Sequence, residues 1–148
     1  MKKLCLLNIF FAIIFTACGG MKATVPDDIY AKQTQGIVEK WIAAYKNKDA
    51  NALLSLYSDD LTWKLCTGAT CDTALLSIVK DAAPVTFAHP SFKVNIQSYV
   101  IVNDGVYAVL QGTYQDATED AHTPTPATVI LVIKNEKISE ETWYYPTN

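Results

Sequence analysis

The chain has 148 residues, of which 50% are hydrophobic and 18% charged, so it is long enough for one domain with a buried core. All 12 basic residues are lysine, and the guanidinium group that contacts phosphate and guanine through paired hydrogen bonds is therefore missing. This composition, with a formal net charge of −3, argues against a nucleic-acid partner.

The N-terminus has the three parts of a signal peptide in the expected order. Lys2 and Lys3 precede an apolar run over residues 4–15, and the small residues Thr16 and Ala17 follow it. A permanent membrane-spanning helix needs about 20 apolar residues, so a retained anchor is the weaker interpretation. We predict a signal peptide over residues 1–17. Its removal leaves ten lysines against 15 acidic residues, a net charge of −5.

Residues 15–19, with the sequence FTACG, resemble a bacterial lipoprotein signal, in which cleavage precedes a cysteine that is then acylated. The resemblance implies that Cys18 is lipidated and holds an exported protein at the membrane of the cell envelope. Because Gly19 follows the cysteine, it implies the outer membrane, facing the periplasm, in a host with two membranes. The alternative is an ordinary secreted protein with a free Cys18. Residues 18–26 then form a tether and residues 27–148 the domain.

The first part of the domain predicts two helices and a strand. Pro26 suits a first helical turn, and a helix to about Lys46 would carry one apolar stripe. Asp49 is expected to cap a second short helix over residues 50–57, which Ser58–Asp60 would end as a solvated turn. Residues 61–66 alternate and predict a strand. The stripe of the first helix consists of Ile37, Val38, Trp41, Ala44 and Tyr45.

Cys66 and Cys71 are close enough to bridge a turn of four residues. In an exported protein such a pair is more often bonded than free, and the spacing fits neither a zinc site nor the common two-residue redox motif. We predict a disulfide that pins this loop. Asp72 is expected to cap a helix that runs to about Lys80 and stops before Pro84.

The second half predicts an antiparallel meander. The expected strands are residues 92–102, with a bulge near Ser98, then 106–113, 127–134 and 137–145. Residues 103–105 read as a hairpin turn, residues 116–126 as a polar loop, and residues 135–136 as a turn. Gly112 is expected at a bend of its strand.

The segment from Ile37 to Cys71 resembles the nuclear transport factor 2-like superfamily, which includes SnoaL-like cyclases, ketosteroid isomerases, dehydratases and non-catalytic binding domains. The resemblance is carried by a long helix with an aromatic residue, a linker that ends in Asp49, a helix that ends in Tyr57, and the turn at residues 58–60 before a strand. It implies an α+β, cone-shaped fold in which N-terminal helices pack on a strongly bent antiparallel sheet. A pocket would open at the wide end of the cone.

The isomerase branch of the family uses a tyrosine on the first helix as hydrogen-bond donor and an aspartate in the following strand as general base. When the chain is matched to that pattern without gaps, Trp41 and Leu65 occupy these positions. Because leucine cannot accept a proton, we predict no catalytic residue. The alternative is a SnoaL-like enzyme, an isomerase, cyclase or dehydratase, that acts on a small apolar substrate through Tyr45, His89 or an acid that the sequence does not place.

Other chemistry has little support in the sequence. Asp59 and Asp60 are interpreted as solvating a turn rather than as a catalytic pair. His122 has acidic neighbours but too few ligands at metal spacing, so we expect no metal site and no cofactor.

The remaining signal is aromatic, because large rings fill a core and can also line a pocket for a small apolar or aromatic ligand. The pocket candidates are Trp41, Tyr45, Trp63, Leu65, Tyr107 and Trp143. The leading hypothesis is a membrane-tethered lipoprotein with a non-catalytic ligand-binding domain. A further alternative is an interaction module that forms a homodimer through the exposed face of its sheet.

Overall fold

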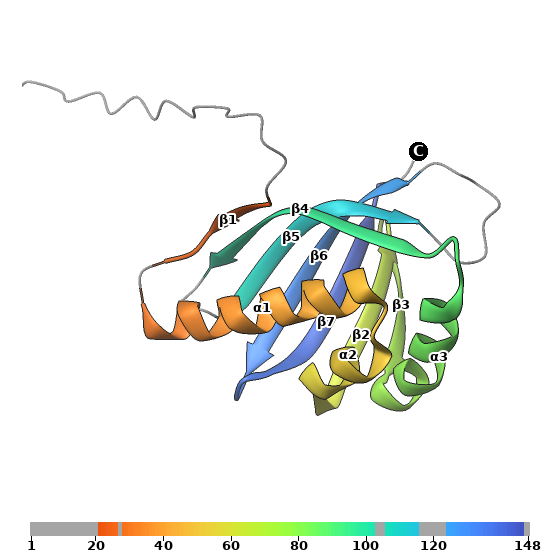
Figure 1. The fold of residues 1–148 in the computed structure, drawn as a ribbon, viewed down its shortest axis with the longest axis horizontal. Helices are drawn as coiled ribbons and strands as arrows, with labels where there is room; N and C mark the ends of the chain where they lie inside the picture. The colour runs from red at the N-terminus through yellow and green to blue at the C-terminus, as the bar shows by residue number, and fades with distance from the viewer. Residues whose placement is uncertain (1–20, 27, 103–105, 116–123, 147–148) are drawn as a thin grey trace, which may run out of the picture.

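A computed structural model describes residues 21–26, 28–102, 106–115 and 124–146 (Figure 1). In this part of the chain three helices lie on one side of a curled seven-stranded sheet. The elements in chain order are β1 (Lys22–Thr24), α1 (Ile29–Asn47), α2 (Ala50–Leu56), β2 (Tyr57–Thr67), β3 (Thr70–Leu75), α3 (Leu76–Ala88), β4 (Lys93–Val102), β5 (Tyr107–Gln115), β6 (Thr125–Lys134) and β7 (Lys137–Tyr145). The α+β, cone-shaped fold expected from the sequence is confirmed.

The strand order in the sheet is β1-β4-β5-β6-β7-β2-β3. The meander from β4 to β7 is antiparallel, as predicted, and β2 pairs with β3 in the same way. However, β1 runs parallel to β4 and β2 runs parallel to β7, so the sheet is mixed rather than antiparallel throughout. The parallel pair β2–β7 brings residues from the two ends of the domain side by side.

The two N-terminal helices begin at aspartate caps. The Asp28 carboxylate accepts a hydrogen bond from the Ala31 backbone N–H at 2.8 Å, and Asp49 accepts one from Ala52 at 2.9 Å. These bonds satisfy N–H groups that a helix start leaves without intrahelical partners. The Asp49 cap is therefore confirmed, whereas α1 begins at Ile29 rather than at Pro26.

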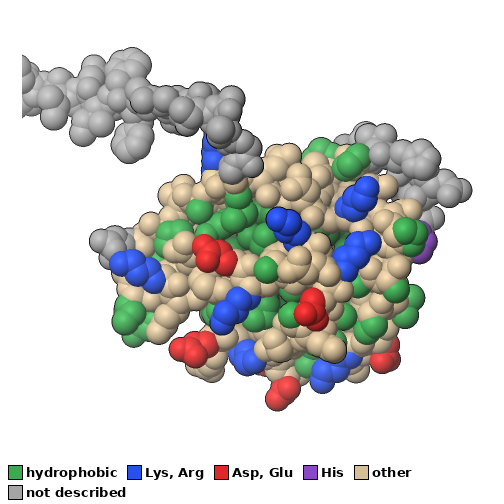
Figure 2. Space-filling view, viewed as in Figure 1, with side chains coloured by type: hydrophobic (Ala, Val, Ile, Leu, Met, Phe, Trp, Pro, Cys, Tyr) green, Lys and Arg blue, Asp and Glu red, His purple; other side chains and the backbone are tan. Residues whose placement is uncertain are grey.

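Helix α1 packs its apolar stripe onto the concave face of the sheet (Figure 1). Val38 and Trp41 of α1 are fully buried there, as are Leu110 and Leu131 of the central strands. The opposite side of α1 faces solvent. Figure 2 shows lysine and acidic side chains interspersed on this face, a mixture that does not create a field of one sign.

Three local predictions between Tyr57 and Ala88 are wrong. Residues 58–60 do not form a turn, because β2 already begins at Tyr57 and continues through an irregularity in its pairing with β7. Asp72 does not cap a helix: it lies in β3 opposite Leu65, and the backbone hydrogen bonds of this hairpin take precedence over the local capping signal. The helix that follows, α3, does not end near Lys80 and stop before Pro84 as predicted, but runs through Pro84 to Ala88. Burial of Ala83 and Phe87 offsets the hydrogen bond that proline cannot donate.

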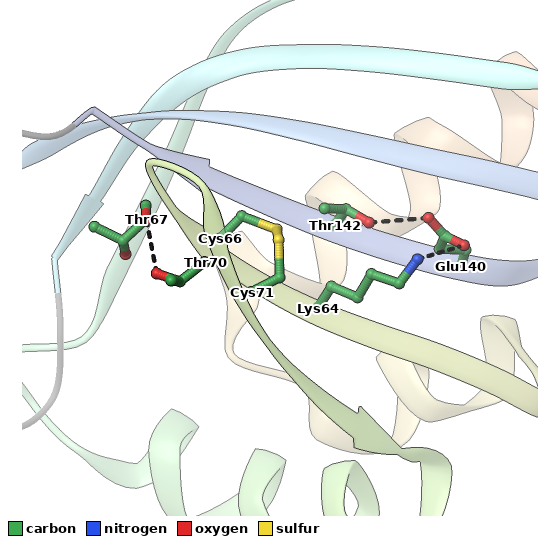
Figure 3. Close-up of a disulfide and its surroundings, with 7 residues drawn as sticks. All are labelled: Lys64, Cys66, Thr67, Thr70, Cys71, Glu140 and Thr142. Atoms are coloured by element: carbon green, nitrogen blue, oxygen red, sulfur yellow. Dashed lines mark hydrogen bonds and ion pairs between the residues drawn. A yellow bond between two sulfur atoms is a disulfide. The ribbon is translucent and has the colours of Figure 1, made fainter.

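The predicted disulfide is present. Cys66 and Cys71 face each other across β2 and β3 and are bonded at 2.02 Å (Figure 3). The Thr70 hydroxyl donates to the Thr67 carbonyl at 3.0 Å and helps to close the turn between the strands. The bridge therefore pins the end of this hairpin rather than joining distant parts of the fold.

Several predictions concern residues outside the described ranges. These are the signal peptide, Cys18, the hairpin turn at residues 103–105 and most of the loop at residues 116–126; the last two residues of that loop, Thr125 and Pro126, belong to β6. Within the predicted tether, Lys22–Thr24 instead pair with Ser98–Val100 as β1. None of the described helices is long and apolar enough to cross a membrane.

Candidate functional site

A cavity of about 200 Å³ lies where α3 closes over the concave face of the sheet. Its aliphatic lining comes mainly from α3, β2 and β3, and Thr86 adds one hydroxyl group. Drug-sized sites usually enclose 300 Å³ or more, so this cavity suits a smaller molecule. The aromatic residues of its wall are Tyr45, Trp63, Phe87, Phe92, Tyr114, Trp143 and Tyr145.

The sequence-predicted candidates are brought together only in part. Tyr45, Trp63, Leu65 and Trp143 line the cavity, although they come from α1, β2 and β7. Trp41 is completely buried and lies outside the lining. Tyr107, at the start of β5, is 37% exposed and is also absent from the cavity wall.

Behind the wall lies a residue that sequence reasoning missed, Glu141 of β7. Its side chain is 0% exposed, and five side chains donate hydrogen bonds to its carboxylate. The donors are Trp41 Nε1 at 2.7 Å, Tyr45 Oη at 2.9 Å, Tyr57 Oη at 2.7 Å, Trp63 Nε1 at 3.1 Å and Trp143 Nε1 at 2.6 Å. All three tryptophans of the chain belong to this group, which we call the Glu141 cluster.

The two carboxylate oxygens face different neighbours. Oε2 accepts from Trp41 and Tyr57, which lie deeper in the core. Oε1 accepts from Tyr45, Trp63 and Trp143, whose rings form part of the cavity wall. Glu141 itself does not line the cavity, so one layer of aromatic side chains separates its charge from the cavity.

The charge of Glu141 is held by uncharged groups. Burial away from water and then the negative charge of Glu141 raise the pKa of Tyr45 and of Tyr57 well above the usual 10.0, so both phenols remain protonated donors. The neighbouring Glu140 points to the opposite face of β7, where Lys64 pairs with it at 3.1 Å (Figure 3). This lysine therefore compensates the exposed carboxylate, not the buried one.

The carboxylate nearest the cavity is fully engaged by donors from its surroundings. A carboxylate offers about four lone-pair positions, and five donors already surround Glu141. Among the described residues that line the cavity there is no Asp, Glu or His. Leu65, at the position where the isomerase branch carries its base, presents an apolar side chain to it.

The other residues considered for chemistry lie elsewhere. His89 is exposed beyond the end of α3, where its Nδ1 accepts a hydrogen bond from the Ser91 N–H at 3.3 Å. Asp59 and Asp60 are exposed on β2, and a hydrogen bond from Ser58 lowers the pKa of Asp60. Across the described ranges, no group of three or more His, Cys, Asp or Glu side chains could hold a metal ion, while His122 lies outside those ranges.

A signal for Glu141 was present in the sequence. Side chains alternate between the two faces of a strand, so Glu141, Trp143 and Tyr145 must share one face of β7. An acid in line with two large aromatic residues at the apolar face is unusual. Its partners could not be read in this way, because they come from α1 and β2 as well as β7.

The comparisons with known proteins agree with this fold. A family model described as a SnoaL-like domain matches residues 38–141. No curated protein matches the chain in sequence.

Among solved structures, the chain is similar to a nuclear transport factor 2-like protein of unknown function from Mesorhizobium loti, with 14% identity, a TM-score of 0.68, and coverage of 82% of this chain and 98% of that one. The chain is also similar to an epoxide hydrolase from M. tuberculosis, with 14% identity and a TM-score of 0.60. The match covers 77% of this chain and 83% of the hydrolase. A third similar structure is a nuclear transport factor 2-like protein of unknown function from Cytophaga hutchinsonii, with 12% identity and a TM-score of 0.59. The match covers 76% of this chain and 88% of that one. At these identities the likeness concerns the fold alone.

Proposed function

The chain belongs to the SnoaL-like domain family, and from that premise we propose that it binds a small, mainly apolar ligand without transforming it. We further propose that a lipid on Cys18 tethers this binding domain to the cell envelope. The observation that carries the first proposal is the composition of the cavity wall, in which aromatic and aliphatic side chains surround about 200 Å³.

The Glu141 cluster favours binding over catalysis. General-base catalysis needs a group within hydrogen-bond reach of the proton it removes. Glu141, the one buried carboxylate among the described residues, instead accepts hydrogen bonds from five side chains of the wall and the core behind it, at distances of 2.6–3.1 Å. Those bonds also turn the polar atoms of Tyr45, Trp63 and Trp143 away from a ligand. The rings are what the wall presents to the cavity.

Ligand binding can be measured through tryptophan fluorescence, because Trp63 and Trp143 line the cavity. We expect titration with toluene to change the emission in a saturable way and to raise the unfolding temperature as occupancy increases. Ala83→Phe places a ring in the cavity from α3 and should weaken binding by about tenfold or more.

Ala88→Phe is the matched control, because Ala88 is exposed on the same helix and does not line the cavity. It should bind toluene like the wild type. Ala74→Phe obstructs the cavity from β3 and gives an independent second test if α3 tolerates no added ring. Absence of saturable binding to the wild type, or equal binding by all four proteins, would overturn the proposal.

The lipid tether rests on the signal-like residues 1–17 and on Cys18. Cells that express the full chain and are fed radiolabelled palmitate should yield a labelled protein. Cys18→Ser should abolish the label, while Cys66→Ser, which breaks the disulfide, should retain it. A wild-type protein that incorporates no palmitate would refute the tether and leave the ligand-binding proposal untouched.

A further inference from the structure

The cavity wall is electron-rich to an unusual degree. Seven of its fifteen lining residues are aromatic. Five of them form a closed circuit of ring contacts, with centroids 5.3–5.8 Å apart, in the order Tyr45, Phe87, Phe92, Tyr114 and Trp143. The face of an aromatic ring carries partial negative charge, and tryptophan and tyrosine attract cations more strongly than other side chains do.

A full negative charge lies directly behind this wall. Glu141 Oε1 is 2.6–3.1 Å from the polar atoms of three wall residues, Tyr45, Trp63 and Trp143. None of the five groups that donate to the carboxylate carries a positive charge, so no counter-charge among them neutralises it, although their dipoles offset part of its field. Because the site is buried, that field is screened much less than it would be in water. Hydrogen bonds donated to an anion also polarise the donor rings toward greater electron density.

The same wall is poor in hydrogen-bond acceptors. Its described lining has no carboxylate, amide or imidazole side chain, so its side-chain acceptors are the hydroxyl oxygens of Thr86 and of three tyrosines, Tyr45, Tyr114 and Tyr145. A primary ammonium group brings three N–H donors, which would exchange their water for neutral hydroxyl acceptors alone, with no carboxylate in the lining. A quaternary ammonium group has no N–H and is covered by methyl groups, so it can enter such a site at lower cost.

We propose that the cavity recognises a small quaternary ammonium group, held by cation–π contacts with its aromatic wall and by the field of Glu141 behind it. This inference rests on the proposed ligand-binding function and names the ligand class. The size of the cavity, about 200 Å³, suits a trimethylammonium head with a short substituent rather than a large cation. The chain's formal net charge of −3 also favours the approach of a cation.

The test compares choline with two close relatives. 3,3-Dimethylbutan-1-ol has the same shape without the charge, and ethanolamine has the charge without the methyl groups. Titrations of the purified protein, followed by tryptophan fluorescence and calorimetry, should show choline binding about tenfold or more tighter than either relative.

Phe87→Leu isolates the contribution of an aromatic face, because leucine keeps the wall apolar. We expect it to weaken choline binding about two- to fivefold more than it weakens dimethylbutanol binding. Tyr30→Leu is the matched control, since Tyr30 is 65% exposed on α1 and lies outside the cavity. It should change neither affinity.

The outcomes separate the two proposals. If dimethylbutanol or ethanolamine binds as tightly as choline, or if Phe87→Leu weakens choline and dimethylbutanol equally, recognition of the quaternary charge is overturned and the apolar binding site stands. If choline and toluene both fail to bind, the proposed function falls together with this inference.

Discussion

Replacing Glu141 with glutamine is expected to lower the free energy of unfolding by about 3–5 kcal/mol, because buried donors lose their acceptor. Glutamine has one acceptor oxygen, and its NH₂ group would face donors. The three indole N–H groups around position 141 can only donate, so they cannot adapt to an amide. Each buried donor left without a partner costs about 1–3 kcal/mol.

The measurement is urea unfolding followed by far-UV circular dichroism, which reports mainly the backbone. Glu140→Gln is the matched control, because the adjacent carboxylate is partly exposed and pairs with Lys64. That change should cost less than about 1 kcal/mol. Tyr57→Phe removes one donor and should cost about 1–2 kcal/mol, which keeps the test usable if Glu141→Gln does not fold. A Glu141→Gln protein as stable as Glu140→Gln would contradict the assigned role.

The Glu141 cluster is also relevant to function. Burying a charge is costly, and well-packed apolar residues can often replace a buried ionic group without loss of stability. What an apolar residue could not do is orient three wall rings by their polar atoms and place a charge behind them. We therefore expect Glu141 to act as a positioning residue for the cavity, in addition to its effect on stability.

The elements that the sequence predicts well are those whose pattern is local. The stripe of α1 and the alternation of β4 to β7 each report one buried face, so the meander could be predicted nearly residue by residue. The hairpin β2–β3 could not be predicted from such a local pattern. Asp72 resembles a helix cap, and only the pairing of β3 with β2 determines that it lies in a strand.

The residues of the site were predictable only where the periodicity of their own strand or helix determines which face the side chain lies on. Alternation alone places Tyr107 on the face of β5 away from this cavity, because Ala108 and Leu110 are the buried residues of the strand. Tyr114, on the same face as Leu110, takes the place in the wall instead. The Glu141 cluster depends on the parallel pairing of β2 with β7, and no local pattern encodes that pairing.

Gly112 gives the second large expected effect, because there is no space for a side chain at this position. A Cβ atom built on Gly112 would lie 2.2 Å from the Asn95 carbonyl oxygen and 2.9 Å from the Ile96 Cα. Both neighbours are backbone atoms of β4, next to the bulge between Ile96 and Ser98, so neither can rotate away. We expect Gly112→Ala to lower the free energy of unfolding by about 3 kcal/mol, measured by urea denaturation.

Gly36→Ala is the matched control for this change. Gly36 lies within α1, and an added Cβ would meet nothing within 4 Å, so alanine should raise the free energy of unfolding by about 0.5–1 kcal/mol. The Gly112→Ala substitution should also disturb the cavity, because Tyr114 lies two residues further along β5 and forms part of the cavity wall. Toluene binding should weaken in Gly112→Ala and stay unchanged in Gly36→Ala. Equal stability of the two variants would show that β4 and β5 can separate at the bulge without cost.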